Sequence, residues 1–463
     1  MGARLQAGPA LLSAIFLTAC AIEADKVPTP TAGLSEKAAF SAGTKTAALP
    51  MTTSGWWRTL GSAELDTLID ALVASNPDLA AASLRVLQSE IERATTLGQN
   101  KPTVSAGLSR TTTSATDPSG DRGTNSTSDL STTVRWEADL WGRIEREGDA
   151  SAARLLAVGY DKDALANSLI ASVVRTYVSI AFDRRQIAST QRIIDNRATS
   201  LAITQDRFGL GVEGTTAGTV KSAEENLAAA RADLPDLELS ILRNTNALDV
   251  LIGRVPVSRS DVSGRLPSRL PAMAFSTGRP IDLLERRPDI RAAEARLTSA
   301  NANMDVSLAD RFPALTLTGS IRSGGDDLDQ IFDIDTVIAS LTADLLLTVF
   351  DAGRGSRLVA LRRAEAEELA QSYVATALSA VAEVEDALAG ERLLAERSRR
   401  LAERLTAARD ATSIARERYR DGTGTYLTLL DASRSEASAE TAFLSVERSR
   451  WLNRIDLMLA LGG

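Results

Sequence analysis

Apolar side chains recur every seven residues along two long, proline-free stretches of the chain, 142–207 and 353–420. In the first stretch these positions are Val173, Ile180, Ile187, Ile194, Leu201 and Phe208. The second stretch keeps the alternating four-three spacing of the same repeat, at Leu401, Leu405, Ala408, Thr412, Ala415 and Tyr419. Such a repeat is typical of a helix that packs against partner helices along its whole length. At 1.5 Å per residue, each stretch predicts a helix roughly 100 Å long.

Four shorter segments alternate between apolar and small polar residues: about 103–113, 130–140, 314–322 and 337–350. Segments of about ten residues with this alternation are typical of transmembrane β-strands. A soluble antiparallel sheet with one face on a core has the same pattern, so the pattern alone leaves both interpretations open. The connections within each strand pair are polar, and the other strand ends lead into the long helices, which favours the membrane interpretation.

Four strands are too few to close a barrel, and an open sheet edge is not tolerated in lipid. Three chains would supply twelve strands, so the sequence requires an oligomer if these strands lie in a membrane. Trp136, Trp141 and Phe350 lie where an aromatic girdle would meet the membrane interface.

The chain is a tandem duplication. Pro77 and Pro288 open matching segments 211 residues apart, and Gly211 and Gly422 keep the same offset. Self-similarity at a fixed offset indicates repeated structural units. The repeats are predicted over 56–253 and 281–463, each with short helices, two strands, a long helix and a return helix, the last at 220–252 or 429–461. The proline-rich segment 254–280 between them predicts an irregular belt against the helices.

Composition excludes several function classes. The formal net charge is −8, which argues against nucleic acid as a partner, and the chain has no histidine and one cysteine. Without histidine it lacks the commonest general base and metal ligand. One cysteine excludes a disulfide framework within the chain and a cysteine-rich metal site. No phosphate-binding loop or Gly-x-Ser-x-Gly motif is present. We therefore expect neither an enzyme nor a protein with a bound cofactor.

The single cysteine lies at the end of a predicted signal peptide, residues 1–19, in which Arg4 precedes a short apolar run. The segment around Cys20 resembles the lipobox of bacterial lipoproteins, in which the cysteine becomes the acylated first residue. Multiple acyl chains such as palmitate would then anchor the protein stably. The alternative is an ordinary signal peptide with an incidental cysteine. Residues 20–55 are predicted to be an extended, lipidated tether.

Several motifs in order resemble the TolC-type outer-membrane efflux proteins. The similarity is closest to the lipoprotein branch (NodT/OprM-like) that serves RND pumps, and it covers essentially the whole mature chain. The motifs that carry it are Trp56-Trp57, Asn76-Pro77-Asp78-Leu79, Arg286-Arg287-Pro288-Asp289-Ile290, Phe312-Pro313, Leu317-Thr318-Gly319-Ser320 and Ala460-Leu461-Gly462-Gly463.

This resemblance implies a mainly helical homotrimer with a twelve-stranded outer-membrane β-barrel and a long periplasmic coiled-coil tunnel. Cys20 would hold each chain to the outer membrane, a periplasmic adaptor would contact the tunnel tip, and an inner-membrane RND transporter would supply the energy. The function implied is a passive duct for efflux of small molecules. Two alternatives stay open: the duct of an ABC-linked type I secretion system, and a lipid-anchored coiled-coil scaffold without a channel.

The resemblance also implies roles for residues at the tunnel tip. Arg207, Gly211, Arg418 and Gly422 match adaptor-contacting tip turns. Asp431 matches the acidic residue that rings the narrowest part of the tunnel, and Tyr419 matches a tyrosine that latches neighbouring hairpins. The chain departs from the family pattern at three positions, where latch or acidic residues are replaced: Thr219, Gly424 and Thr428. The exported substrate cannot be read from the sequence.

Overall fold

A computed structural model describes residues 24–34, 39–40, 55–116, 118–256, 262–271, 279–326 and 330–463. The predicted signal peptide and Cys20 lie outside the described residues. The chain divides into two compact units. The first comprises Met1–Thr31, Arg85–Gly159 and Ala292–Val374, and the second comprises Ala32–Leu84, Tyr160–Arg291 and Ala375–Gly463.

Each compact unit contains segments from both sequence repeats, so the repeats do not fold as two successive bodies. The boundaries between the units fall inside the two long helices, after Gly159 and after Val374. The long helices therefore run through both units. Their bounds, with those of the return helices, are α3 Arg143–Gly209, α4 Ala217–Leu251, α7 Arg354–Arg420 and α8 Tyr426–Ala460.

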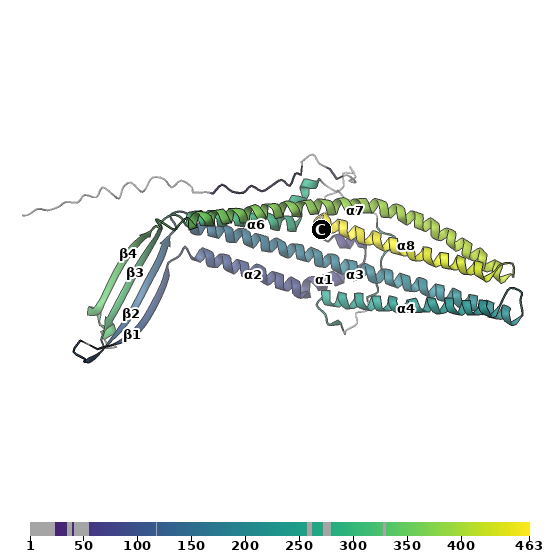
Figure 1. Cartoon of the computed structure of the whole chain (residues 1–463), viewed down its shortest axis with the longest axis horizontal. Helices are drawn as coiled ribbons and strands as arrows, with labels where there is room; N and C mark the ends of the chain where they lie inside the picture. Colours follow the sequence, from purple (N-terminus) through teal and green to yellow (C-terminus); the bar gives the residue numbers. More distant parts are fainter. Residues whose placement is uncertain are drawn as a thin grey trace, which may run out of the picture. The chain divides into compact units, whose positions relative to one another are not determined.

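Unit 1 contains one antiparallel sheet in the order β1-β2-β3-β4 (Figure 1). Its strands are β1 Thr103–Thr116, β2 Arg122–Ala138, β3 Ala314–Gly325 and β4 Val337–Leu346. The strands differ in length from the prediction. The first hairpin pairs out to Thr116 opposite Arg122, within the segment predicted as a loop, while β4 ends before 350. At the ends of this hairpin, Ser and Thr occupy both faces of the strands. Their backbones pair, but the sequence has no apolar alternation there from which a strand could be predicted.

The register of the sheet gathers the alternating apolar residues onto one face. Val104, Val134, Gly319 and Leu341 lie in one row across the four strands. The adjacent row, from Thr103 to Thr342, is polar. The members of this face on β1 and β4 are exposed, with Leu341 82% exposed. An exposed apolar face of this kind indicates an apolar environment or a partner. Its further members are Ala106, Leu108, Leu130, Trp136, Ala138, Leu315, Leu317, Ile321, Val337, Ala339, Ala343 and Leu345.

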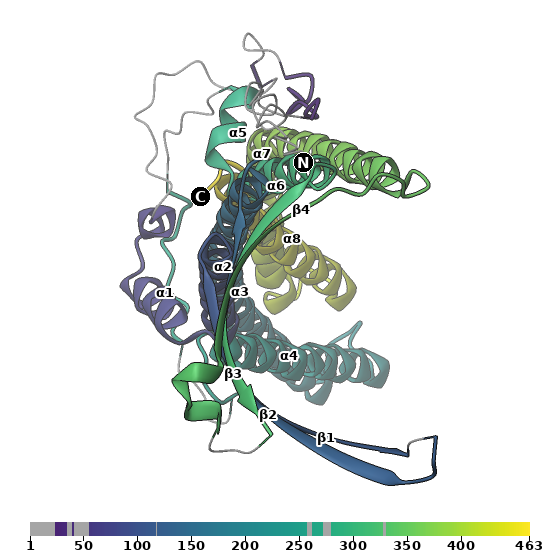
Figure 2. The same ribbon diagram turned by 90° about the vertical axis from the view of Figure 1, so that its left-hand side faces the viewer.

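Both outer edges of the sheet are free. β1 and β4 each pair with one neighbouring strand within the described residues, and every residue of both strands is exposed. Figure 2 shows that the sheet is curved rather than flat. A long edge presents a row of unpaired backbone donors and acceptors, which is a template for another strand.

The strand-to-helix junction in unit 1 is fixed by side chains from both repeats. Trp141 donates from Nε1 to the carbonyl of Pro313 at 2.7 Å and packs against the ring of Phe312. Arg143 at the start of α3 binds Glu137 at 2.9 Å. Trp141, considered above as a girdle residue, therefore packs inside this junction.

The main core of unit 2 surrounds the middle of α3. Val173 and Ile180 of the seven-residue repeat are fully buried there. Phe208, the last repeat position, is 47% exposed because it lies at the end of the helix. Helix α3 also contains an 18-residue window apolar enough to cross a membrane, but 61% of that window is buried in the protein.

The shorter elements complete the two units. Short helices precede each strand pair in the chain. Short 3-10 helices lie before α1, before α5 and between β3 and β4. They are η1 Trp56–Leu60, α1 Ala63–Ser75, α2 Pro77–Gly98, η3 Pro280–Asp282, α5 Leu283–Arg286, α6 Pro288–Ala309, η4 Gln330–Phe332 and η5 Ile334–Thr336.

The described part of the proline-rich segment is tied to α1 and α3 by a buried polar network. The Tyr177 hydroxyl lies 2.8 Å from Glu64 Oε2 and 2.9 Å from Ser62 Oγ. Ser263 donates from its backbone nitrogen to Glu64 Oε1 at 2.8 Å. Next to it, a side chain at Gly264 would lie 3.1 Å from the backbone of Ala181, so the segment approaches α3 closely.

This network predicts a loss of stability at alkaline pH. Burial, with the hydrogen bond to Glu64 and its negative charge, raises the pKa of Tyr177 to about 12 from an ordinary value of 10.0. The stabilisation from the neutral phenol is therefore complete below pH 10 and lost as the pH rises towards about 12. Thermal unfolding midpoints from pH 9 to 12 should fall more steeply for the wild type than for Tyr177→Phe. Parallel curves would contradict this assignment.

Candidate functional site

Two tip turns, one after α3 and one after α7, have the same backbone motif. Gly211 and Gly422 have φ of 68° and 81°, in the left-handed region. The amide of Val212 donates to the carbonyl of Arg207, and the amide of Thr423 donates to that of Arg418, each at 2.9 Å. These 6→1 bonds are those of a Schellman motif, which favours glycine at its left-handed position. The duplication is therefore preserved at the level of hydrogen bonds.

The two tip turns differ in length and in the room they leave for side chains. α4 begins at Ala217, six residues after Gly211, whereas α8 begins at Tyr426, four residues after Gly422. The turn of the first repeat is therefore two residues longer. In the shorter turn, a Cβ on Gly424 would lie 3.0 Å from the Cβ of Arg418. That turn cannot hold an arginine at position 424 without moving, so the latch arginine of the resembled family has no equivalent there.

Tyr419 instead joins the two helical hairpins from the end of α7. Its ring is 2% exposed, and its hydroxyl lies 2.9 Å from the Thr204 Oγ1 on α3. The guanidinium of Arg207 lies 4.7 Å from the centre of the Tyr419 ring and donates to the Tyr419 carbonyl. We call Thr204, Arg207 and Tyr419 the tip clasp. It connects the first hairpin (α3 and α4) to the second (α7 and α8).

The four predicted adaptor-contacting residues are not equivalent in the structure. Arg207 is partly buried in the tip clasp, whereas Arg418, its counterpart in the second repeat, is exposed. Gly211 and Gly422 are exposed at the turns. The sequence places both arginines at the same repeat position and contains no signal that one of them turns towards Tyr419.

A second set of contacts joins the hairpins farther from the turns. Asn226 of α4 is buried, and its backbone carbonyl accepts from Arg197 of α3 at 2.6 Å. Its side-chain oxygen accepts from Arg434 of α8 at 2.9 Å. Burial, and then the positive charge of Arg434, lower the pKa of Arg197. Arg192 of α3 also binds Glu440 of α8 at 2.6 Å. Sequence reasoning missed the links between the hairpins, because Asn226 and Arg434 are 208 positions apart and Arg192 and Glu440 are 248 apart.

Asp431 is exposed on α8, within two turns of the start of that helix. Its carboxylate has no ion pair within the described part of the chain. An exposed carboxylate without an ion pair is available to a passing cation.

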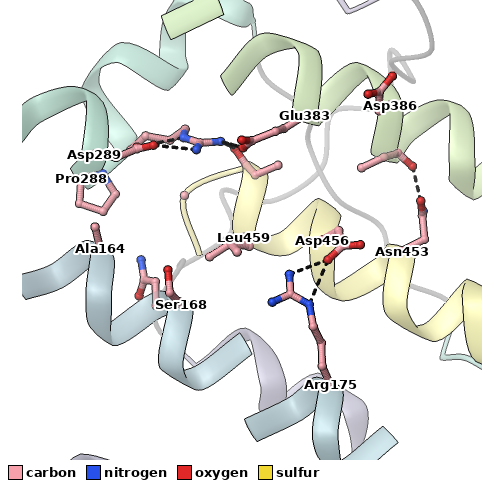
Figure 3. A pocket seen from close by; sticks show the side chains of 15 residues that line it. Ala164, Ser168, Arg175, Pro288, Asp289, Glu383, Asp386, Asn453, Asp456 and Leu459 are labelled. Carbon is pink, nitrogen blue, oxygen red and sulfur yellow. Dashed lines mark hydrogen bonds and ion pairs between the residues drawn. The ribbon is translucent and has the colours of Figure 1, made fainter. Parts of the chain in front are cut away.

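A groove of about 560 Å³ lies in unit 2 between α3, the α5–α6 junction, α7 and α8 (Figure 3). Most of its charged side chains form ion pairs with one another. Arg175 binds Asp456 at 2.6 Å, and Arg287 binds Asp289 at 2.8 Å and Glu383 at 2.6 Å. Burial opposes the charge on Arg287, but these two carboxylates raise its pKa overall.

The groove has the chemistry of a structural joint. Its ion pairs join α3 to α8, and the α5–α6 junction to α7. Within the described residues, no group of His, Cys, Asp or Glu side chains has the geometry to hold a metal ion.

The sequence matches the outer membrane efflux protein family over residues 68–254 and 280–463, which are the two repeats. It is 30% identical to the pyoverdine export outer membrane protein OpmQ of Pseudomonas putida, over 94% of this chain and 93% of that protein. It is 28% identical to the toluene efflux pump outer membrane protein TtgF, also of Pseudomonas putida, over 86% of this chain and 82% of that protein.

The fold agrees with these matches. The structure of the outer-membrane channel OprN superposes with a TM-score of 0.85 and 29% identity, covering 96% of this chain and 99% of that one. The chain therefore belongs to the outer membrane efflux protein family and is an outer-membrane channel component of an efflux system.

Proposed function

We propose that three copies of the chain form one continuous duct through the outer membrane and the periplasm. The observation that supports this most is the sheet, with one apolar face and two unpaired edges. In lipid, β4 of one chain must pair with β1 of the next, because no free edge is tolerated there. Three sheets give twelve strands, enough for an aperture wider than one filled by side chains.

The proposal includes a lipid anchor and two protein partners. Cys20 would carry the covalent lipid, a periplasmic adaptor would contact the tip turns, and an inner-membrane RND transporter would drive export. The exposed Arg418 and the exposed turns at Gly211 and Gly422 support contact with an adaptor. An ABC-linked secretion system remains the second candidate, because a passive duct has the same structure in both systems.

The tip clasp and Asp431 form the gate in this proposal. Opening the tunnel requires the second hairpin to move away from the first, which breaks the contacts of Tyr419 with Thr204 and Arg207. Three Asp431 carboxylates around one constriction would attract cations and repel anions.

Replacing Asp431 with alanine is therefore expected to lower the cation-to-anion permeability ratio of the purified protein in planar bilayers. The reversal potential under a KCl gradient measures this ratio. Asp421→Ala is the matched control, since it removes the same charge from the exposed tip turn. A reversal potential that is the same in both variants and the wild type would remove Asp431 from the constriction.

In this proposal, the transporter rather than the duct selects the substrate that is exported. OpmQ is named for pyoverdine and TtgF for toluene, and the chain resembles both to a similar degree. A polar siderophore and an apolar solvent share no binding chemistry, so likeness to the duct does not assign a substrate. The alternative of a lipid-anchored scaffold without a channel is tested by the same planar bilayer recordings, because such a scaffold would give no conductance.

A further inference from the structure

Residues 20–55 were expected to be an extended tether, but residues 24–27 of this stretch are bound to α6 in unit 1. The side-chain amide of Asn301, on α6, forms two bonds with the backbone of Val27. Its Oδ1 accepts from the Val27 amide at 3.1 Å, and its Nδ2 donates to the Val27 carbonyl at 2.9 Å. An amide that pairs with both backbone groups of one residue imitates the edge of a β-strand.

Two further contacts hold the residues before Val27. The amide of Ala24 donates to Asp305 Oδ1 at 2.8 Å, and Lys26 lies 3.7 Å from Asp305 Oδ2. Asp305 is 4% exposed, so its carboxylate is directed into this contact rather than into solvent. Asn301 and Asp305 are four residues apart and therefore lie on the same face of α6.

The side chain of Val27 packs against an apolar cluster formed by α6 and α7. Its buried members are Leu297 of α6 and Ala366 and Ala370 of α7, and all three are at most 3% exposed. We call this cluster, with Asn301 and Asp305, the α6–α7 surface. The α6–α7 surface therefore recognises an extended peptide with a modest apolar residue at one position and a backbone that pairs with an amide.

We propose that the α6–α7 surface is a docking site for the chain's own segment 24–27, and that docking shortens the lipid anchor to a leash of four residues. Four extended residues span at most about 14 Å, whereas a free tether from 20 to 55 would span up to roughly 120 Å. Docking thus limits the distance that an acylated Cys20 can reach from α6. The leash rests on the proposed lipidation of Cys20, but docking of segment 24–27 does not.

Trypsin tests the docking, because the bond after Lys26 lies within the docked segment. We expect cleavage at Lys26 of the purified full-length protein to be slow in the wild type and about tenfold faster in Asn301→Ala, which loses both amide bonds. Asn303→Ala is the matched control, since it removes the same side chain two residues along α6. Asn301→Asp keeps the acceptor for the Val27 amide and loses the donor, so its rate should be intermediate.

Mass spectrometry of the released N-terminal fragment gives the cleavage rate and the acyl mass separately. Equal cleavage rates in the wild type, Asn301→Ala and Asn303→Ala would overturn the docking site. Unfolding midpoints of the variants close to that of the wild type would show that faster cleavage reports release of the segment. A fragment without acyl mass would contradict the lipidation of Cys20 and leave the docking result intact.

Discussion

Replacing Leu341 with arginine should abolish assembly of the channel in the membrane. Leu341 lies in the middle of β4, on the apolar face formed by all four strands, and is 82% exposed. An arginine facing lipid near the middle of the bilayer costs roughly 2–4 kcal/mol in each chain. Every chain of an oligomer carries the change, so the penalty recurs around the barrel.

The next residue supplies the control for this prediction. Thr342 is on the other face of β4, in the polar row with Arg135 and Thr318. Thr342→Arg adds the same side chain to the same strand, but on the face assigned to the aqueous interior. We expect outer-membrane fractions to contain Thr342→Arg at near the wild-type amount and little Leu341→Arg. Equal amounts of the two variants would mean that the apolar face does not contact lipid.

Replacing Arg207 with alanine should open the tunnel tip. The stacking of Arg207 on Tyr419 stabilises the closed arrangement by roughly 0.5–2 kcal/mol. Its bond to the Tyr419 carbonyl adds about 1.5–3 kcal/mol. The Nε of Arg207 is buried without a hydrogen-bond partner, which offsets part of this gain. A net loss of about 1.4 kcal/mol already changes the ratio of open to closed channels tenfold.

Planar bilayer recordings measure this opening. The Arg207→Ala variant should conduct for a larger fraction of the time, or at a higher level, than the wild type. Arg418→Ala should behave as the wild type, because Arg418 is the same residue at the same repeat position but is exposed. A smaller opening is expected for Tyr419→Phe, which loses only the bond to Thr204. Closed channels in all three variants would show that the tip clasp does not hold the gate.

The sequence predicted the elements of the fold better than the contacts between them. The seven-residue repeat predicted α3 and α7 nearly to their ends, since apolar spacing reports a helix directly. The alternation in the strands predicted their faces, and the register confirms that these residues share one face. The Ser- and Thr-rich ends of the first hairpin were missed because their pairing leaves no trace in hydrophobicity.

The structure of the tunnel tip was predicted only in part, because some of its features are local in sequence and others are not. The glycines of both turns follow from a local rule, since a left-handed residue ends each helix. The role of Arg207 depends on Tyr419, more than 200 residues away, and no local pattern reports such a pair. Docking of segment 24–27 was missed likewise, because the stretch that contains it, residues 20–55, is rich in Ala, Thr and Pro and has the composition of a free tether.

The central claim is that three sheets share one closed wall, and the mass of the purified particle tests it most directly. After solubilisation in mild detergent and correction for bound detergent, light scattering should give a protein mass of three chains, each of at most 49.1 kDa. A stable particle with the mass of one chain, folded and with β1 and β4 unpaired, would contradict the account.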